Sequence, residues 1–194
     1  MSDPRIDAVL AFWFERLSME EWFTRSDRVD QLIQEHLAAL MGFAAQGTLH
    51  HWRDTLRGTR ALILLLDQVP RNCFREDPRA FAHDHQAASI TDFALKHYGE
   101  EIAALSPTET LFVLLPFEHA EDLSLQNRCV QLFKAFADRF TDADSTLWND
   151  LTDYAIRHQV VIEQFGRFPH RNQVLGRDTT ADEAAWLADN PTGF

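Results

Sequence analysis

Apolar residues recur at intervals of three and four along almost the whole chain, and this spacing constrains the fold more than any other feature. Three stripes of this kind run through residues 29–44, 125–140 and 151–165. Such spacing places apolar side chains on one face of an α-helix. No segment shows a sustained alternation of apolar and polar residues, and no Asn-Gly or Asp-Gly pair marks a hairpin. The sequence therefore predicts an all-α fold.

Helix ends are marked by capping residues. Ser-Pro-Thr-Glu at 106–109 and Thr-Ala-Asp-Glu at 180–183 each have the form of a capping box. Three glycines follow apolar patterns and are expected to end helices: Gly47, Gly99 and Gly166. We therefore expect helices near residues 5–17, 27–46, 49–56, 60–68, 78–98, 107–116, 119–139, 145–165 and 181–189.

The predicted helices belong to one domain of about eight or nine helices covering residues 1–194. No long linker, low-complexity tract or block of like charge marks a domain boundary. Two segments, 61–66 and 111–115, are apolar nearly all round, so we expect them at the centre of the fold.

Charge and composition exclude several classes of protein. The net charge of −12 disfavours binding to nucleic acid or to anionic membranes, which both require a positive field. No apolar run approaches the roughly 20 residues that span a bilayer. The N-terminus lacks the basic region of a signal peptide, and only two cysteines are present. We expect a cytoplasmic protein, and nothing in the sequence specifies an oligomeric state.

Two proline turns carry arginine and asparagine together. In the first, at 67–75, Pro70 is expected to end or kink its helix, because it lacks an amide hydrogen. Asp67 lies on the buried side, and three polar residues follow: Arg71, Asn72 and Arg75. One interpretation is a structural latch in which Asp67 pairs with Arg71. The other is part of a wall that binds an anion.

The second proline turn, at 165–177, holds four basic residues and a further asparagine: Arg167, His170, Arg171, Arg177 and Asn172. Acidic residues that could neutralise them lie in 116–123. There, Glu118, Glu121 and Asp122 would share one face if the segment were helical. Either these acids close the network with the arginines, or part of the network opens onto a pocket.

These residues support two hypotheses that stay open. The first is a module that binds a small anionic molecule or an acidic peptide end. Its expected site comprises Asp67, Arg71, Asn72, Arg75, Glu118, Asp122, His158, Arg167, Arg171, Asn172 and Arg177. The second is an enzyme in which His119 or His170 transfers protons and arginines hold an anionic substrate. The carboxylate that orients or shares the protons would be that of Glu118, Glu121 or Asp122. A scaffold for other proteins is a third interpretation. No cofactor is predicted.

Other chemistry has little support in the sequence. No Glu-x-x-His pair, His-Glu-x-x-His motif, glycine-rich phosphate loop or Gly-x-Ser-x-Gly elbow is present. His83 and His85 diverge on a helix, which makes them poor metal ligands. Cys73 lies beside arginines that would lower its pKa. The alternative for Cys73 is a small buried apolar residue, and we favour that alternative.

Several of these motifs together resemble a known bacterial family. "LLLDQVPRNCFR", "LLPFEHAEDLSLQNR", "FGRFPHRNQVLGR" and "TADEAAWL", with the opening "VLAFWF" and the final Phe194, are similar to domain-of-unknown-function family 924. The resemblance implies an all-helical fold like a tetratricopeptide superhelix and no established activity. Val69, Glu118 and Ala120 depart from the family pattern, and Ala120 removes a serine at that position.

Overall fold

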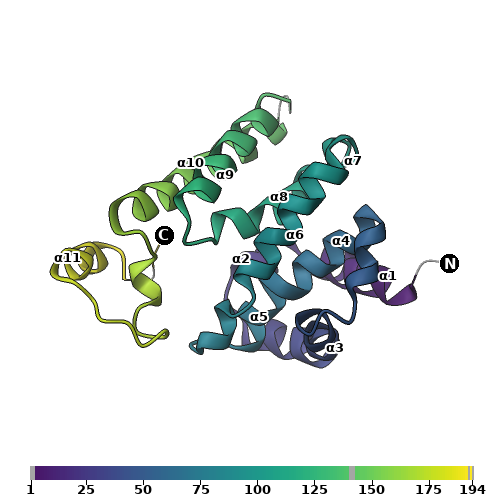
Figure 1. The fold of residues 1–194 in the computed structure, drawn as a ribbon, viewed down its shortest axis with the longest axis horizontal. Helices are drawn as coiled ribbons and strands as arrows, with labels where there is room; N and C mark the ends of the chain where they lie inside the picture. The colour runs from purple at the N-terminus through teal and green to yellow at the C-terminus, as the bar shows by residue number, and fades with distance from the viewer. Residues whose placement is uncertain (1–2, 140–142, 192, 194) are drawn as a thin grey trace. The chain divides into compact units, whose positions relative to one another are not determined.

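The structure is a computed structural model that describes residues 3–139, 143–191 and 193 (Figure 1). Its described residues form helices and connecting turns without a β-strand, which confirms the all-α prediction. Contacts between Cα atoms divide the chain into two compact units, Met1–Pro116 and Phe117–Phe194, called here the first and second unit. The single domain and the likeness to a tetratricopeptide superhelix stay predictions.

The first unit contains most of the helices. In chain order they are α1 (Pro4–Ala11), a π-helical turn (Phe12–Arg16), α2 (Met19–Phe23), α3 (Asp27–Ala45), the 3-10 helix η2 (His50–Asp54), α4 (Leu56–Ile63), a second π-helical turn η3 (Leu64–Gln68), α5 (Val69–Cys73), a 3-10 helix (Pro78–Phe81), α6 (Asp84–His97), α7 (Gly99–Ala103) and α8 (Pro107–Glu118), which ends just beyond the unit boundary.

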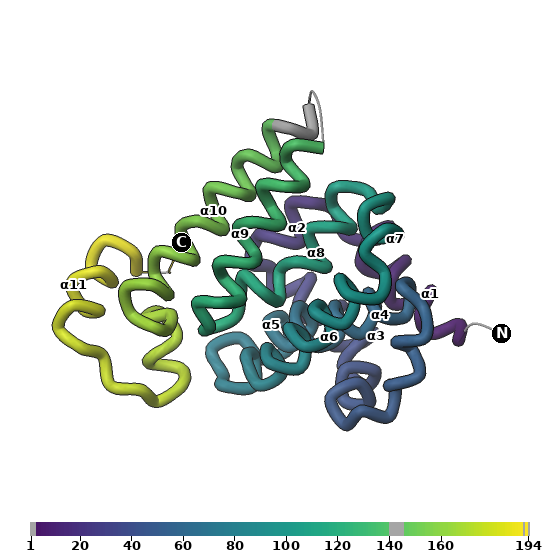
Figure 2. The backbone as a smooth tube through the Cα atoms, turned by 45° about the horizontal axis from the view of Figure 1, so that its top comes forward, coloured from purple at the N-terminus to yellow at the C-terminus, as the bar shows by residue number. Residues whose placement is uncertain are grey.

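The second unit is built on two long helices. Helices α9 (Leu123–Ala137) and α10 (Ala143–Phe165) lie side by side, as Figure 2 also shows. A 3-10 turn (Pro169–Arg171) and an irregular segment lead to the last helix, α11 (Ala181–Asp189). Phe140 and Phe194, which the sequence analysis used, lie outside the described residues.

The two segments expected at the centre are buried in the first unit. Every side chain from Ala61 to Leu66 is at most 3% exposed, and those from Leu111 to Leu115 are at most 6% exposed. Helix α4 packs against α1 and α6, and α3 packs against α5. The apolar surface of α4 and its π turn therefore supplies the centre of this unit, as its sequence predicted.

Pro70 does not end its helix, so the first of the two predicted alternatives is wrong. The chain stays helical from Leu56 to Cys73, and the π turn η3 precedes the proline. Within that wider turn the amide of Val69 donates to the carbonyl oxygen of Leu64, five residues earlier. Pro70 then occupies one of the first positions of α5, where its missing N–H costs little.

The core of the second unit is aromatic. The ring of Trp148 on α10 contacts Phe133 and Phe136 of α9, at centroid distances of 5.4 and 5.6 Å. At the other end of α10, Val161 and Ile162 pack with Phe168, which follows the helix. These contacts tie the turn after α10 to the helix pair.

Capping signals in the sequence located helix starts well. Both capping boxes form, at Ser106 and at Thr180, and Gly47 and Gly166 have positive φ angles of 74° and 69°. Short helices α2 and α7 were not predicted. Helix α6 ends at His97, close to the expected end, and Gly99 then begins α7. Within the described residues, every helix is too short or too polar to span a lipid bilayer.

Candidate functional site

The predicted residues of the first proline turn form a closed cluster. Arg71 donates two hydrogen bonds to the carboxylate of Asp84, at 2.8 and 2.9 Å, and one to the backbone oxygen of Asp67 at 2.5 Å. The side chain of Asp67 is fully buried, 3.5 Å from the same guanidinium. This geometry is that of the structural latch, with Asp84 as an additional carboxylate that the sequence analysis did not identify.

Arg75 is held in a similar way. Its guanidinium pairs with the carboxylate of Asp30 on α3 and donates to the side-chain oxygen of Asn72 at 3.1 Å. Burial and the negative charge of Asp30 raise the pKa of the Cys73 thiol to about 11. Cys73 is therefore a protonated, half-buried thiol at neutral pH, as the favoured interpretation expected, and not an activated nucleophile.

In the second unit, Glu121 lies at the centre of a cluster around the other proline turn. Its carboxylate accepts two hydrogen bonds from Arg177, at 2.6 and 3.0 Å, and one from the amide of Phe168 at 2.8 Å. Arg177 also donates to Asn172 and to the backbone oxygen of Phe168, both at 3.0 Å. Burial opposes ionisation, but these donors lower the pKa of Glu121 overall.

Glu183 of α11 neutralises Arg167, and the sequence analysis did not propose this residue for the site. The carboxylate accepts bonds from Arg167 at 2.6 and 2.8 Å, from Asn172 at 3.2 Å and from the amide of Thr180 at 2.8 Å. The hydrogen bond from Arg167 is the main cause that lowers the pKa of Glu183 to about 2. Its place in a capping box was the only signal in the sequence.

The segment from Glu118 to Asp122 is not helical, so the condition under which these acids would share one helix face is not met. Helix α8 ends at Glu118, and Asp122 is the N-cap of α9, where its side chain accepts from the amide of Leu125 at 3.0 Å. The side-chain amide of Gln126 donates to the backbone oxygens of Glu118 and Ala120, at 2.6 and 2.8 Å. These bonds stabilise the turn between the two helices in place of a continuous helix.

Two histidines of the second unit, the buried His158 and the partly buried His170, are neutral at pH 7. His158 donates from Nδ1 to the backbone oxygen of Tyr154 at 3.0 Å, and its Nε2 lies 4.0 Å from a carboxylate oxygen of Glu118. Burial lowers the pKa of His158 to about 3 and that of His170 to about 4. Arg171, whose guanidinium lies over the ring of Phe168, adds to both effects. The proton-transfer role considered for His119 and His170 stays a prediction.

We expect the second unit to lose stability between pH 6.5 and 5. Because the folded-state pKa values of His158 and His170 are lowered to about 3 and 4, the unfolded chain binds more protons below pH 6.5. Stability is complete above that pH and falls by about 1.4 kcal/mol per pH unit for each histidine. Urea unfolding at pH 7, 6 and 5 measures this slope. An unchanged slope in His158→Leu would contradict the assignment.

The predicted site residues thus divide between the two units. Asp67, Arg71, Asn72 and Arg75 belong to the first unit, and the remaining candidates belong to the second. The expected cavity shared by both turns stays a prediction. Among the described residues, no group of three or more His, Cys, Asp or Glu side chains is arranged to hold a metal ion.

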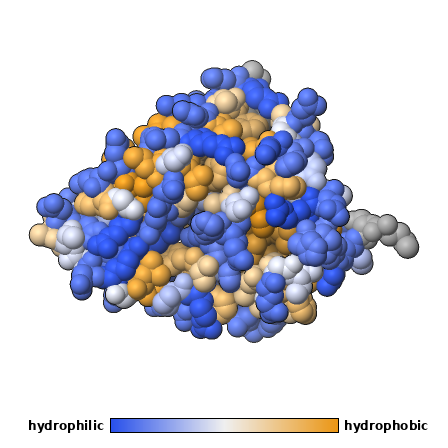
Figure 3. Space-filling model, viewed as in Figure 1, coloured by the Kyte–Doolittle hydropathy of each residue, from blue (hydrophilic) through white to orange (hydrophobic). Residues whose placement is uncertain are grey.

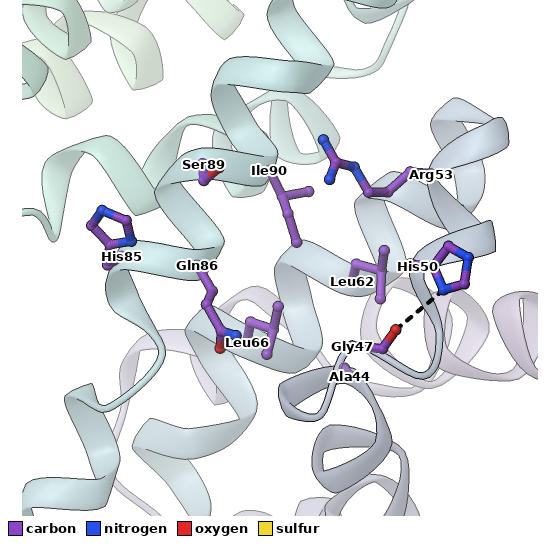
Figure 4. Close-up of a pocket in the computed structure, with 10 residues that line it drawn as sticks. All are labelled: Ala44, Gly47, His50, Arg53, Leu62, Leu66, His85, Gln86, Ser89 and Ile90. Atoms are coloured by element: carbon purple, nitrogen blue, oxygen red, sulfur yellow. Dashed lines mark hydrogen bonds between the residues drawn. The ribbon is translucent and has the colours of Figure 1, made fainter.

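A pocket of the first unit is lined by none of these predicted residues. It has a volume of about 230 Å³ and is lined by residues of α3, the following turn, η2, α4, η3 and α6 (Figure 4): Ala44, Gly47, His50, Arg53, Leu62, Leu66, His85, Gln86, Ser89 and Ile90. Ala44, Leu62 and Leu66 form an apolar floor, while the polar side chains stand around it. On the face shown in Figure 3, apolar areas alternate with hydrophilic ones.

Hydrogen bonds fix two walls of this pocket. Gln86 on α6 donates to the backbone oxygen of Ala45 at the end of α3, at 3.3 Å, and its side-chain oxygen lies 2.9 Å from Nδ1 of His83. His50 bonds through Nδ1 to the backbone oxygen of Gly47 at 3.3 Å. The walls therefore hold their positions before any molecule enters.

Arg53 differs from every other arginine of the first unit. Its guanidinium carbon lies 4.0 Å from the centre of the Phe93 ring, and its Nε is shielded from water without a hydrogen-bond partner. Within residues 3–116, the other arginines each donate a side-chain hydrogen bond, in most cases to a carboxylate: Arg5, Arg16, Arg25, Arg28, Arg57, Arg60, Arg71, Arg75 and Arg79. Arg53 makes no ion pair.

The position of Arg53 depends on its neighbours in the chain. Trp52 is buried, and its indole nitrogen donates to Asp3 at 3.0 Å. The backbone of Trp52 lies directly against Gly58 of α4, which has no side chain to prevent this approach. The hydroxyl of Tyr98 donates to the backbone oxygen of Arg53 at 2.7 Å. Sequence reasoning missed this site. The run "HHWRD" was its only signal, and that run does not show which residues surround Arg53 in the fold.

The fold and the pocket define an all-α protein with a small, preformed recess in its first unit. Residues 9–191 match the family model described as bacterial protein of unknown function (DUF924), and the chain belongs to this family. The resemblance seen in the sequence is thereby confirmed.

One solved structure extends this assignment. A protein of unknown function from Agrobacterium tumefaciens is similar at 31% sequence identity and a TM-score of 0.83, with 96% of this chain and 98% of that chain covered. No curated protein matches the chain significantly. These comparisons assign a family and a fold, and they name no activity.

Proposed function

We propose that this protein binds a small organic molecule in the pocket between α3, η2, α4 and α6. The observation that carries the proposal is an apolar floor that lies open beside a charged group without an ion pair. Ala44, Leu62 and Leu66 form the floor, and Arg53 stands at the wall. Apolar pockets with a few polar groups at the edge are the usual form of a small-molecule site.

The arginines at the two proline turns are weaker candidates for a ligand. Arg71, Arg75, Arg167 and Arg177 already contact carboxylates of their own unit. An incoming anion would have to displace a carboxylate from a formed, charge-assisted hydrogen-bond pair. Arg53 requires no such displacement, which favours the pocket as the place where an arginine of this chain meets a ligand.

We also propose a cytoplasmic location for this binding. Both cysteines, Cys73 and Cys129, are free, and a chain with free thiols and no disulfide suits a reducing compartment. Expression of a tagged chain followed by cell fractionation tests this point, and recovery in an oxidising compartment would oppose it.

Filling the pocket should abolish binding. Ser89 is exposed on α6 at the pocket wall, so Ser89→Phe places a ring in the recess without disturbing the core. We expect 2-phenylethanol and phenylacetate to shift the methyl resonances of Leu62, Leu66 and Ile90 in the wild-type protein. Those shifts should be lost in Ser89→Phe.

Lys96→Phe is the matched control for this variant. Lys96 is exposed on the same helix, two turns further on, and does not line the pocket. The Lys96→Phe variant should bind 2-phenylethanol and phenylacetate as the wild-type protein does. If neither compound moves these methyl resonances in the wild type, or if Ser89→Phe leaves the shifts intact, the pocket does not bind such molecules and the proposal fails.

A further inference from the structure

We propose, on the basis of the binding function above, that the ligand is a monocarboxylate with an apolar body of about six to eight carbon atoms. The feature behind this inference is the pairing of a single available guanidinium with an apolar recess of limited volume. Arg53 would hold the carboxylate, and the recess over Leu62, Leu66 and Ile90 would hold the body.

The charge of the head group follows from Arg53. Its guanidinium lies over the Phe93 ring, with the central carbon 4.0 Å from the ring centre. Stacking uses the face of the guanidinium and leaves the N–H groups at its edge for hydrogen bonds. Nε is already covered, so the two terminal nitrogens are the donors. Two parallel N–H groups match the two oxygens of a carboxylate.

A singly charged head fits better than a phosphate. Arg53 is the one arginine in the pocket lining, and Gln86 is already engaged by Ala45 and His83. The whole chain has a net charge of −12, which opposes additional negative charge. A phosphate dianion normally requires several donors and cations, whereas a carboxylate is satisfied by one arginine fork.

The size of the body follows from the pocket volume. A cavity of about 150 Å³ lined by apolar side chains accommodates a benzene molecule. The pocket here has about 230 Å³, which leaves room for a ring or a short chain of that size together with a carboxylate. Contact with Leu62 and Leu66, both at most 3% exposed, removes the remaining floor area from water.

Binding constants for matched acids and alcohols test the assignment. Phenylacetate and 2-phenylethanol share the same apolar body, as do hexanoate and 1-hexanol, while acetate has the head alone. We expect each acid to bind wild-type protein at least tenfold more tightly than its alcohol, since a hydrogen bond between charged groups is stronger than one to a neutral hydroxyl. Acetate should bind at least tenfold more weakly than hexanoate.

Arg53→Met removes the charge but keeps the length of the side chain against Phe93. It should weaken binding of both acids at least tenfold and change binding of the alcohols less than twofold. The affinity of Arg53→Lys for the acids should lie between that of the wild type and that of Arg53→Met, because an ammonium group keeps the charge but cannot form the bidentate pair. The control is Arg57→Met, since Arg57 contacts only the exposed Asp7 and lies outside the pocket.

The outcomes separate the inference from the function on which it rests. If alcohols bind as tightly as acids, or if Arg53→Met binds acids like wild type while keeping its melting temperature, the pocket binds ligands but the carboxylate assignment is wrong. If neither acids nor alcohols bind, the proposed function fails together with the inference. Selective loss of acid binding in Arg53→Met supports both.

Discussion

Gly58→Ala should lower the free energy of unfolding by at least about 3 kcal/mol. A Cβ atom at this position would lie 2.1 Å from the backbone oxygen of Trp52 and 2.9 Å from its carbonyl carbon. These are backbone atoms, so no side-chain rotation can relieve the overlap. Either α4 or η2 must move, and both pack in the centre of the first unit.

The sign of this effect is the opposite of the general expectation. Replacing glycine by alanine inside a helix usually raises the free energy of unfolding by roughly 0.5–1 kcal/mol. Gly42 in α3 provides the matched control, because nothing lies within 4 Å of a Cβ at that position. Gly42→Ala should therefore stabilise the protein. Urea unfolding of both variants measures the difference, and equal stability of the two would refute the close approach at Gly58.

The same variant connects the fold to the pocket. Gly58 allows Trp52 to approach α4, and Arg53 is the next residue in the chain. A shift of η2 would displace the guanidinium from Phe93. Any Gly58→Ala protein that folds should consequently bind hexanoate more weakly than Gly42→Ala does.

Glu183→Ala should destabilise the second unit by about 3 kcal/mol. Glu183 is 2% exposed and accepts hydrogen bonds from Arg167, Asn172 and the amide of Thr180. Removing the carboxylate leaves the side-chain NH2 group of the fully buried Asn172 with the hydroxyl of Thr179, at 3.4 Å, as its acceptor. Arg167 is 28% exposed at its side chain and recovers part of its loss in water.

Asp182→Ala is the control for this second variant. Asp182 precedes Glu183 in the first turn of α11 and is exposed. Its removal should lower the free energy of unfolding by only about a few tenths of a kcal/mol, because the favourable interaction of its charge with the helix dipole is lost. Chemical denaturation at pH 7 compares the two variants. If Glu183→Ala were as stable as Asp182→Ala, the network around Arg167 would contribute nothing to the fold.

Much of the fold could be predicted from the sequence, because helix signals are local. The stripe at 29–44 and the boxes at 106–109 and 180–183 correspond to helices that start within a residue or two of the expected positions. The sequence could not show that the helix continues past Pro70. A five-residue π turn before Pro70 accommodates its missing N–H, and no pattern of residue types marks such a turn. The turn after Glu118 depends on Gln126, eight residues away.

The candidate site was harder to predict, because its contacts are distant in the sequence. Arg75 finds its carboxylate 45 residues earlier, at Asp30, and Arg177 finds Glu121 56 residues earlier. Counting arginines at the proline turns located charged clusters and could not show that carboxylates already occupy them. The pocket was missed for the converse reason. Its defining feature is that Arg53 makes no ion pair with any residue that the structure describes, and a sequence does not display an absent contact.

Intermolecular nuclear Overhauser effects from bound phenylacetate test the central claim most directly. The claim is that an organic acid lies in the pocket of the first unit with its ring on the apolar floor and its carboxylate at Arg53. We predict contacts from the ring protons to the methyl groups of Leu62, Leu66 and Ile90. Contacts confined to methyl groups of the second unit, or a bound acid with no contact to these three residues, would contradict the account.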